Sequence, residues 1–206
     1  MTELNSIFFL SLGLVIISHV PIRKLIFKQD SNEILVRDNI LNYLLILNIL
    51  LILSLLNFKL ETILITILII SLIICIYYFK SFVKFSFINF IILIAFTLIC
   101  SVEISNKLVL YWDSQKLWLP KALIFLNSNE LSDLNNTSRA YYPFFGSIYW
   151  AALWKSSGLN YEYLGRIGYL FLFFLGLLYF IENIKLKRKI KLILFFLISF
   201  ITYDYW

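Results

Sequence analysis

The chain has 206 residues, of which 61% are hydrophobic and only 15% are charged, and its net charge is +6. A soluble domain carries roughly half apolar and about a quarter charged residues, and its high surface-to-volume ratio prevents it from hiding this much apolar surface. We therefore expect an integral membrane protein. The basic residues form no continuous stripe of the kind that nucleic-acid binding needs, so no nucleic-acid partner is expected.

Apolar stretches of nearly membrane-spanning length recur along the chain, since a crossing takes about 17–25 largely apolar residues. They are Ile7–Ile22, Asn39–Asn57, Thr62–Phe79, Phe85–Val102, Leu164–Ile181 and Ile190–Trp206. We predict an all-α, polytopic transmembrane helix bundle of about six spans. Residues 1–104 would form four transmembrane helices, residues 105–163 an extracytoplasmic loop with short interfacial helices, and residues 164–206 two further transmembrane helices.

Lysine and arginine gather in the first, third and last of the predicted short connections, whereas the second holds only Lys59. The basic residues are Arg23, Lys24, Lys28, Arg37, Lys80, Lys84, Lys185, Lys187, Arg188, Lys189 and Lys191. Basic connections face the cytoplasm, so we predict that the N-terminus lies outside. The apolar stretch Gly146–Ser157 is too short to cross, and a crossing there would put the last basic cluster outside. We therefore predict an interfacial or re-entrant helix for it.

Cysteine and histidine predict neither a disulfide nor a metal site. Cys75 and Cys100 lie in apolar runs at depths that differ by roughly 18 Å, which is too far for a disulfide. The single histidine, His19, closes the first apolar run and is expected to be an interfacial polar residue. It has no Cys/His cluster around it of the kind that binds zinc.

The segment from Ser105 to Tyr163 is polar and aromatic, unlike the rest of the chain. Asp113 falls just beyond the fourth helix, at the membrane surface and within reach of a lipid headgroup. From Asp113 to about Asn127 the pattern is amphipathic, which predicts a helix in the interface plane. Pro120 either kinks this helix or starts its second part. A further short helix is predicted after Pro143, beginning at Gly146.

These residues follow a recognisable order of Trp-Asp, Trp, Lys-Ala and Tyr-Pro. The matching positions are Trp112, Asp113, Trp118, Lys121, Ala122, Tyr142 and Pro143. The arrangement resembles the first extracytoplasmic loop of GT-C type membrane glycosyltransferases, and most nearly bacterial relatives of the protein mannosyltransferase and lipid A aminoarabinose transferase group. The resemblance covers roughly Phe85–Ile181. Members of that group are longer, so it implies that the chain is the N-terminal portion of such an enzyme, in a bacterial inner (plasma) membrane.

The resemblance implies transfer of a sugar from a polyprenyl-phosphate carrier to an acceptor at the outer face. It makes Asp113 the candidate catalytic base, a role worth about 10²–10⁴-fold in rate. The candidate substrate-binding residues are Lys116, Lys121, Arg139, Tyr142 and Arg166. Their cations would meet the leaving phosphate, which an arginine can clamp with two hydrogen bonds. Many relatives carry a second acid, for which Glu130 and Asp133 are unmatched candidates.

Other interpretations stay open. Asp113 could simply cap the following helix, Lys121 and Arg139 could snorkel to anionic headgroups, and the tryptophans could form an aromatic belt. The chain could also be a non-catalytic membrane subunit of a transport or polysaccharide-assembly complex, with a partner membrane subunit if it is complete. The sequence leaves open the sugar, the acceptor and whether a divalent metal assists.

Overall fold

The structure is a computed structural model that describes residues 3–18, 36–56, 58–77, 87–106, 110–127 and 132–201, without the side chains of 36, 37, 87–90, 103, 105 and 106. The described chain is all helical and has no strand. Its α-helices are α1 (Glu3–Ser18), α3 (Val36–Leu55), α4 (Leu60–Tyr77), α6 (Phe87–Asn106), α7 (Leu119–Asn127), α8 (Phe145–Ser156), α9 (Tyr163–Asn183) and α10 (Arg188–Ile201). A π-helix covers Ser114–Trp118 and a 3₁₀-helix covers Ser132–Asn136.

The predicted all-α class is confirmed for the described residues, and each of the six apolar stretches overlaps a helix: α1, α3, α4, α6, α9 and α10. Within the described ranges, three helical segments are long and apolar enough to cross a membrane: Asp38–Leu55, Leu60–Tyr77 and Tyr163–Asn183. The described parts of α1 and α10, with 16 and 14 residues, are shorter, and α6 has 20 residues, of which Ile91–Val102 form a described apolar stretch. The described residues thus include three helices with the length and hydropathy of a membrane crossing, and the number of six crossings stays a prediction.

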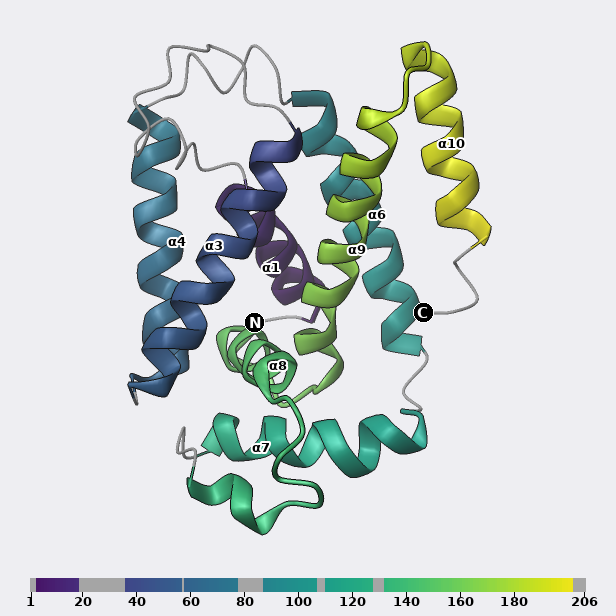
Figure 1. Ribbon diagram of the computed structural model, residues 1–206. Coiled ribbons are helices and arrows are strands. Elements are labelled where there is room, and N and C mark those ends of the chain that lie inside the picture. Colours follow the sequence, from purple (N-terminus) through teal and green to yellow (C-terminus); the bar gives the residue numbers. More distant parts are fainter. Residues whose placement is uncertain are drawn as a thin grey trace.

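The long helices alternate in direction (Figure 1). α1, α4 and α9 run toward one end of the bundle, and α3, α6 and α10 run back. The start of α1, the end of α6 and the loop helices therefore share one end, while the α9–α10 turn lies at the other. Arg23, Lys24, Lys28, Lys80 and Lys84, which were used to predict the orientation, lie outside the described residues, as do His19 and Glu130.

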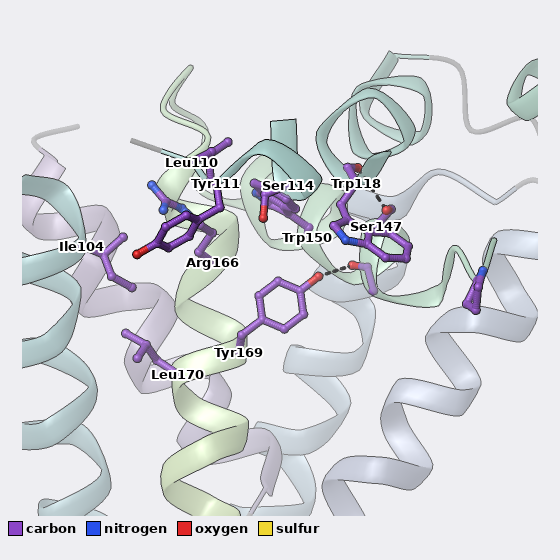
Figure 2. Close-up of a pocket in the computed structure, with 12 residues that line it drawn as sticks. Ile104, Leu110, Tyr111, Ser114, Trp118, Ser147, Trp150, Arg166, Tyr169 and Leu170 are labelled. Carbon is purple, nitrogen blue, oxygen red and sulfur yellow. Dashed lines mark hydrogen bonds between the residues drawn. The ribbon is translucent and has the colours of Figure 1, made fainter. Parts of the chain in front are cut away.

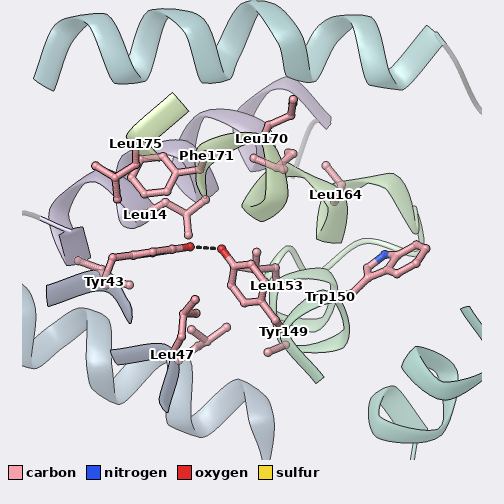
Figure 3. Close-up of a cluster of buried hydrophobic side chains, with 14 of the residues drawn as sticks. Leu14, Tyr43, Leu47, Tyr149, Trp150, Leu153, Leu164, Leu170, Phe171 and Leu175 are labelled. Atoms are coloured by element: carbon pink, nitrogen blue, oxygen red, sulfur yellow. Dashed lines mark hydrogen bonds between the residues drawn. The ribbon is translucent and has the colours of Figure 1, made fainter. Parts of the chain in front are cut away.

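The centre of the bundle is α9, which packs against α1, α3, α6, α8 and α10. In its apolar window 61% of the residues are buried, compared with 39% in α3 and 22% in α4. Phe171 and Phe174 on its inner side are fully buried, and Phe171 meets Tyr43 of α3 edge to face (Figure 3). Because its aromatic side chains contact several helices at once, α9 is the helix around which the others are arranged.

The short helix α8 lies across the bundle rather than along it, since Figure 1 shows it nearly end-on while α9 stands upright. It begins at Phe145, one residue from the predicted start. Ile148, Ala151 and Ala152 have no exposed surface, because α8 is enclosed by α7, α9, α3 and α4. The hydroxyl of Tyr149 forms a hydrogen bond with that of Tyr43 (Figure 3). This helix is thus built into the end of the bundle.

Two glycines of α9 make room for α8. A Cβ added at Gly165 would collide with the side chain and carbonyl oxygen of Trp150, and one added at Gly168 would collide with Tyr149 and Leu153. Small residues let helix backbones approach closely, which is a common device of membrane helices. The crossing of α8 over α9 therefore depends on the missing Cβ atoms at these two positions.

We predict that Gly165→Ala and Gly168→Ala each destabilise the protein in detergent by about 1–3 kcal/mol, the usual effect of overpacking. The matched control is Gly176→Ala on the same helix, where an added Cβ meets no atom within 4 Å. The control should be neutral or slightly stabilising, since alanine is the better helix former. Thermal unfolding followed by size-exclusion chromatography measures the difference. Equal melting temperatures for all three variants would show that α8 and α9 do not cross this closely.

Candidate functional site

The segment between α6 and α9, which we call the loop, lies at the lower end of the bundle (Figure 1). It contains a helix whose turns are wider at its start than at its end. Residues 112–127 are continuously helical, with a π-helix at Ser114–Trp118 followed directly by α7. The amide of Leu119 donates to the carbonyl of Ser114, five residues back, which is the wide turn of a π-helix. Pro120 is the second residue of α7 and directly follows the π-helix, so its missing N–H falls where the wide turn has already interrupted the regular α-helical hydrogen bonds. Pro120 therefore marks a change of pitch within one continuous helical segment.

Between this segment and the bundle lies a pocket of about 490 Å³. Its walls come from the end of α6, residues 110–118, α8 and the first turns of α9. The lining residues are Ile104, Leu110, Tyr111, Ser114, Trp118, Pro143, Gly146, Ser147, Trp150, Arg166, Tyr169 and Leu170 (Figure 2). A mostly apolar and aromatic pocket with a few polar groups is typical of a small-molecule or lipid site. Arg166 is the only charged side chain among these described lining residues.

Hydrogen bonds between the elements fix the pocket walls. The Tyr169 hydroxyl donates to the Gly146 carbonyl at 2.6 Å, and the Ser147 hydroxyl donates to the Trp118 carbonyl at 3.1 Å (Figure 2). The first bond joins α9 to the start of α8, and the second joins α8 to the π-helix. The cavity is therefore preformed by the fold.

A charged pair borders the pocket. One Nη atom of Arg166 donates to Oε1 of Glu162 at 2.8 Å, and both side chains are mostly buried. Burial raises the pKa of the Glu162 carboxyl above its usual range, although the Arg166 guanidinium beside it acts the other way. The Nε atom of Arg166 and Oε2 of Glu162 are buried and have no partner among the described residues. The Arg166 guanidinium is thus held by Glu162, and the described residues do not satisfy all of its hydrogen-bonding groups.

Glu162 was missed in the sequence analysis, although a signal for it exists. Glu162 and Arg166 are four residues apart at the start of a predicted helix, the spacing at which side chains meet on one helix face. The backbone also ties this position to α8, because the Trp150 indole donates to the Glu162 carbonyl at 2.9 Å. The pair is thus held at the junction of α8 and α9.

Lys121 was expected to bind substrate, but the structure places it elsewhere. Its side chain is completely buried, and its ammonium donates to the carbonyls of Arg139 at 2.9 Å and Tyr142 at 3.0 Å. The rings of Trp118 and Tyr142 lie 5.6 and 5.8 Å from Nζ, within range of a cation–π interaction. Burial lowers the pKa of this ammonium. The ammonium of Lys121 therefore holds the loop residues Arg139 and Tyr142 against α7.

Arg139 and Tyr142 belong to the same cluster as Lys121. Arg139 has a φ of +54°, a left-handed conformation that is uncommon for a residue with a Cβ. Its guanidinium donates to the Tyr142 hydroxyl and lies 5.1 Å from the centre of that ring. Neither residue lines the pocket. The structure thus brings three of the predicted site residues together, but as a support for the loop beside the pocket.

Asp113 and Lys116 are exposed and do not line the pocket, although their neighbours Tyr111 and Ser114 do. Asp113 occupies the position before the π-helix, yet its carboxylate makes no capping hydrogen bond in the described part of the chain. The capping interpretation of Asp113 is therefore not supported. Of the predicted substrate-binding residues, Arg166 alone lines the pocket.

Two tryptophans of the loop, Trp118 and Trp150, line the pocket as well. Trp112 is largely exposed, and Trp154 donates its indole N–H to the Leu159 carbonyl. No group of three His, Cys, Asp or Glu side chains comes together among the described residues.

Comparison of the chain with models of known protein families, with curated proteins and with solved structures finds no match.

We predict that Lys121→Met destabilises the loop, since methionine fills the space of the lysine stem but leaves the two carbonyls unpaired. Hydrogen bonds from a charged donor contribute about 1.5–3 kcal/mol, so unfolding and proteolysis within residues 132–142 should both become easier. Lys116→Met, which changes an exposed lysine one turn away, is the control. Limited proteolysis with mapping of the cut sites measures the effect. Equal resistance of the two variants would contradict the structural role of Lys121.

Proposed function

We propose that the chain is the membrane-embedded, N-terminal portion of a GT-C type glycosyltransferase, which moves a sugar from a polyprenyl-phosphate carrier to an acceptor at the outer face. In this proposal α1, α3, α4, α6, α9 and α10 all cross a bacterial inner membrane. The N-terminus and the loop lie outside, and the α9–α10 turn lies in the cytoplasm. The alternating helix directions support this topology, because they put the start of α1 and the loop at one end (Figure 1).

The observation that carries the proposal is the pocket between the loop and the helix bundle. A polyprenyl-phosphate sugar has an apolar chain, a phosphate and a polar sugar, and it needs a site that offers all three environments in order. Ile104 and Leu170 lie on the side of the pocket toward the bundle, and Ser114 lies on the side toward the loop (Figure 2). Arg166 lies between them, nearer than Leu170 to the start of α9. This order matches a lipid phosphate that enters from the membrane and presents its sugar outward.

Arg166 would bind the phosphate. A guanidinium can hold a phosphate by two parallel hydrogen bonds, and the buried Nε of Arg166 is without a partner among the described residues. Glu162 would keep the guanidinium oriented through its bond to Nη. Trp118 and Trp150 offer aromatic surface beside it. Lys116, exposed on the π-helix, would add positive charge near the phosphate.

Asp113 would act as the base that accepts a proton from the acceptor hydroxyl or amine. In sequence it lies between Tyr111 and Ser114, which both line the pocket. Its carboxylate is exposed, so an incoming acceptor could reach it. Lys121, Arg139 and Tyr142 would act indirectly, because they hold the loop that carries Asp113 against α8. In this proposal the site needs both the loop and the first turn of α9.

The test uses the full-length gene in its own cells, with Asp113→Asn, Arg166→Gln and the control Glu61→Gln, which changes an exposed carboxylate in the first turn of α4. Asp113→Asn should lower sugar transfer to surface glycans by about 10²–10⁴-fold and leave binding of polyprenyl phosphate unchanged. Arg166→Gln should weaken that binding at least tenfold, and Glu61→Gln should alter neither. Mass spectrometry of the glycans and native mass spectrometry of the purified protein give the two readouts.

Unchanged glycans with normal levels of the Asp113→Asn protein would remove the transferase proposal. If polyprenyl phosphate still bound and still depended on Arg166, the result would favour a non-catalytic lipid-binding subunit of a polysaccharide-assembly complex. If neither variant had any effect, the pocket would have no role with this lipid.

A further inference from the structure

The α9–α10 turn, at the end of the bundle far from the loop, carries a dense group of cations. Its basic residues are Lys185, Lys187, Arg188, Lys189 and Lys191. Lys191 donates to the carbonyl of Glu182 at 2.7 Å and to its carboxylate at 3.2 Å, so these two charges offset each other. The other four are exposed and lie within five consecutive positions. We call these four residues, 185 and 187–189, the basic turn.

Basic residues at the loop end of the bundle are used differently. Lys121 is buried on two carbonyls, Lys155 donates to the Leu126 carbonyl, and Arg139 donates to the Tyr142 hydroxyl. The other exposed lysines of the described chain, Lys59 and Lys116, are far apart in sequence. The basic turn is thus the part of the described surface where several solvent-exposed cations adjoin.

Below the basic turn, α10 has two unlike faces. Its inner face buries Phe195 and Ser199, and Phe195 meets Phe96 of α6 and Phe174 of α9. Its outer face carries Lys189 and then an exposed apolar stripe made of Ile193, Phe196, Leu197 and Phe200. These positions follow one another at intervals that fall on a single helix face. Exposure reaches 56% at Ile193 and 74% at Phe200.

A cationic group joined to an apolar stripe on one helix face is complementary to a phospholipid with an anionic headgroup. The phosphate would lie among the cations and an acyl chain would lie along the stripe. Each Lys or Arg near the surface adds about 1 kcal/mol to the binding of an anionic lipid, whereas a zwitterionic lipid gains little from a positive surface. A soluble anion would use the basic turn and leave the stripe uncovered.

We propose that the basic turn and the outer face of α10 form a binding site for an anionic glycerophospholipid, with Arg188 and Lys189 at the phosphate and the apolar stripe along an acyl chain. The site lies at the opposite end of the bundle from the pocket, so it does not depend on the proposed transferase function. Its occupation would hold the α9–α10 turn at the membrane surface and stabilise the protein by mass action.

The test measures lipid retained by the purified full-length protein in native mass spectrometry, together with its melting temperature. The probes are long-chain phosphatidylglycerol, phosphatidylcholine of the same chain length, short-chain phosphatidylglycerol and inorganic phosphate. Long-chain phosphatidylglycerol should bind and raise the melting temperature more than the other three. Lys189→Gln should weaken its binding about fivefold (~1 kcal/mol), and the change of all four basic-turn residues to Gln should abolish it. Lys59→Gln, an exposed lysine at the other end of α3 and α4, should have no effect.

Equal binding of phosphatidylglycerol and phosphatidylcholine would overturn the proposal, and so would equal losses from Lys189→Gln and Lys59→Gln. The same protection by inorganic phosphate or by the short-chain lipid would show an ion site without an acyl contact, which also contradicts it. The four-residue variant removes only exposed side chains, so its folding can be verified by the melting temperature without added lipid.

Discussion

The structure depends on the close crossing of α8 over α9. Because Gly165 and Gly168 have no Cβ, the Trp150, Tyr149 and Leu153 side chains of α8 reach the central helix. With α8 in this place, its far side packs on α3, α4 and α7, and the start of α9 is brought beside the end of α6 and the π-helix. The pocket is a consequence of this crossing, since α8 supplies its floor and α9 its only charged side chain among the described lining residues.

Two buried cations near this crossing, Lys121 and Arg166, have different roles. Lys121 is enclosed by the loop and donates to carbonyls, so it contributes to the shape of the site. Arg166 is oriented by Glu162 and has a buried Nε without a partner in the described structure, so the proposal assigns the anionic ligand to it. An enzyme that handles a lipid phosphate at a membrane surface needs both functions, a rigid loop and a desolvated cation. The proposed transferase assigns the first to the Lys121 cluster and the second to Arg166.

The sequence predicts the helices well because apolar runs of this length have few alternatives in a membrane. The short helix after Pro143 was also predicted to within one residue, since proline and the length of the apolar run mark it. The burial of Lys121 was not predictable, because the carbonyls that hold it come from residues 18 and 21 positions away. For the same reason the pocket could not be predicted: its walls come from four separate segments. The Glu162–Arg166 pair was predictable from its spacing and was overlooked.

The central claim is that α8 enters the end of the bundle and returns on the same side, while α9 crosses the membrane. Single cysteines at Tyr141, Tyr161 and Leu186, all exposed, test it in a chain whose Cys75 and Cys100 are replaced by alanine. Labelling of intact cells with a membrane-impermeant maleimide should modify the first two positions, and Leu186→Cys should react only after the membrane is opened. Labelling of Tyr141→Cys and Tyr161→Cys from opposite sides would show that α8 crosses the membrane and would contradict the account.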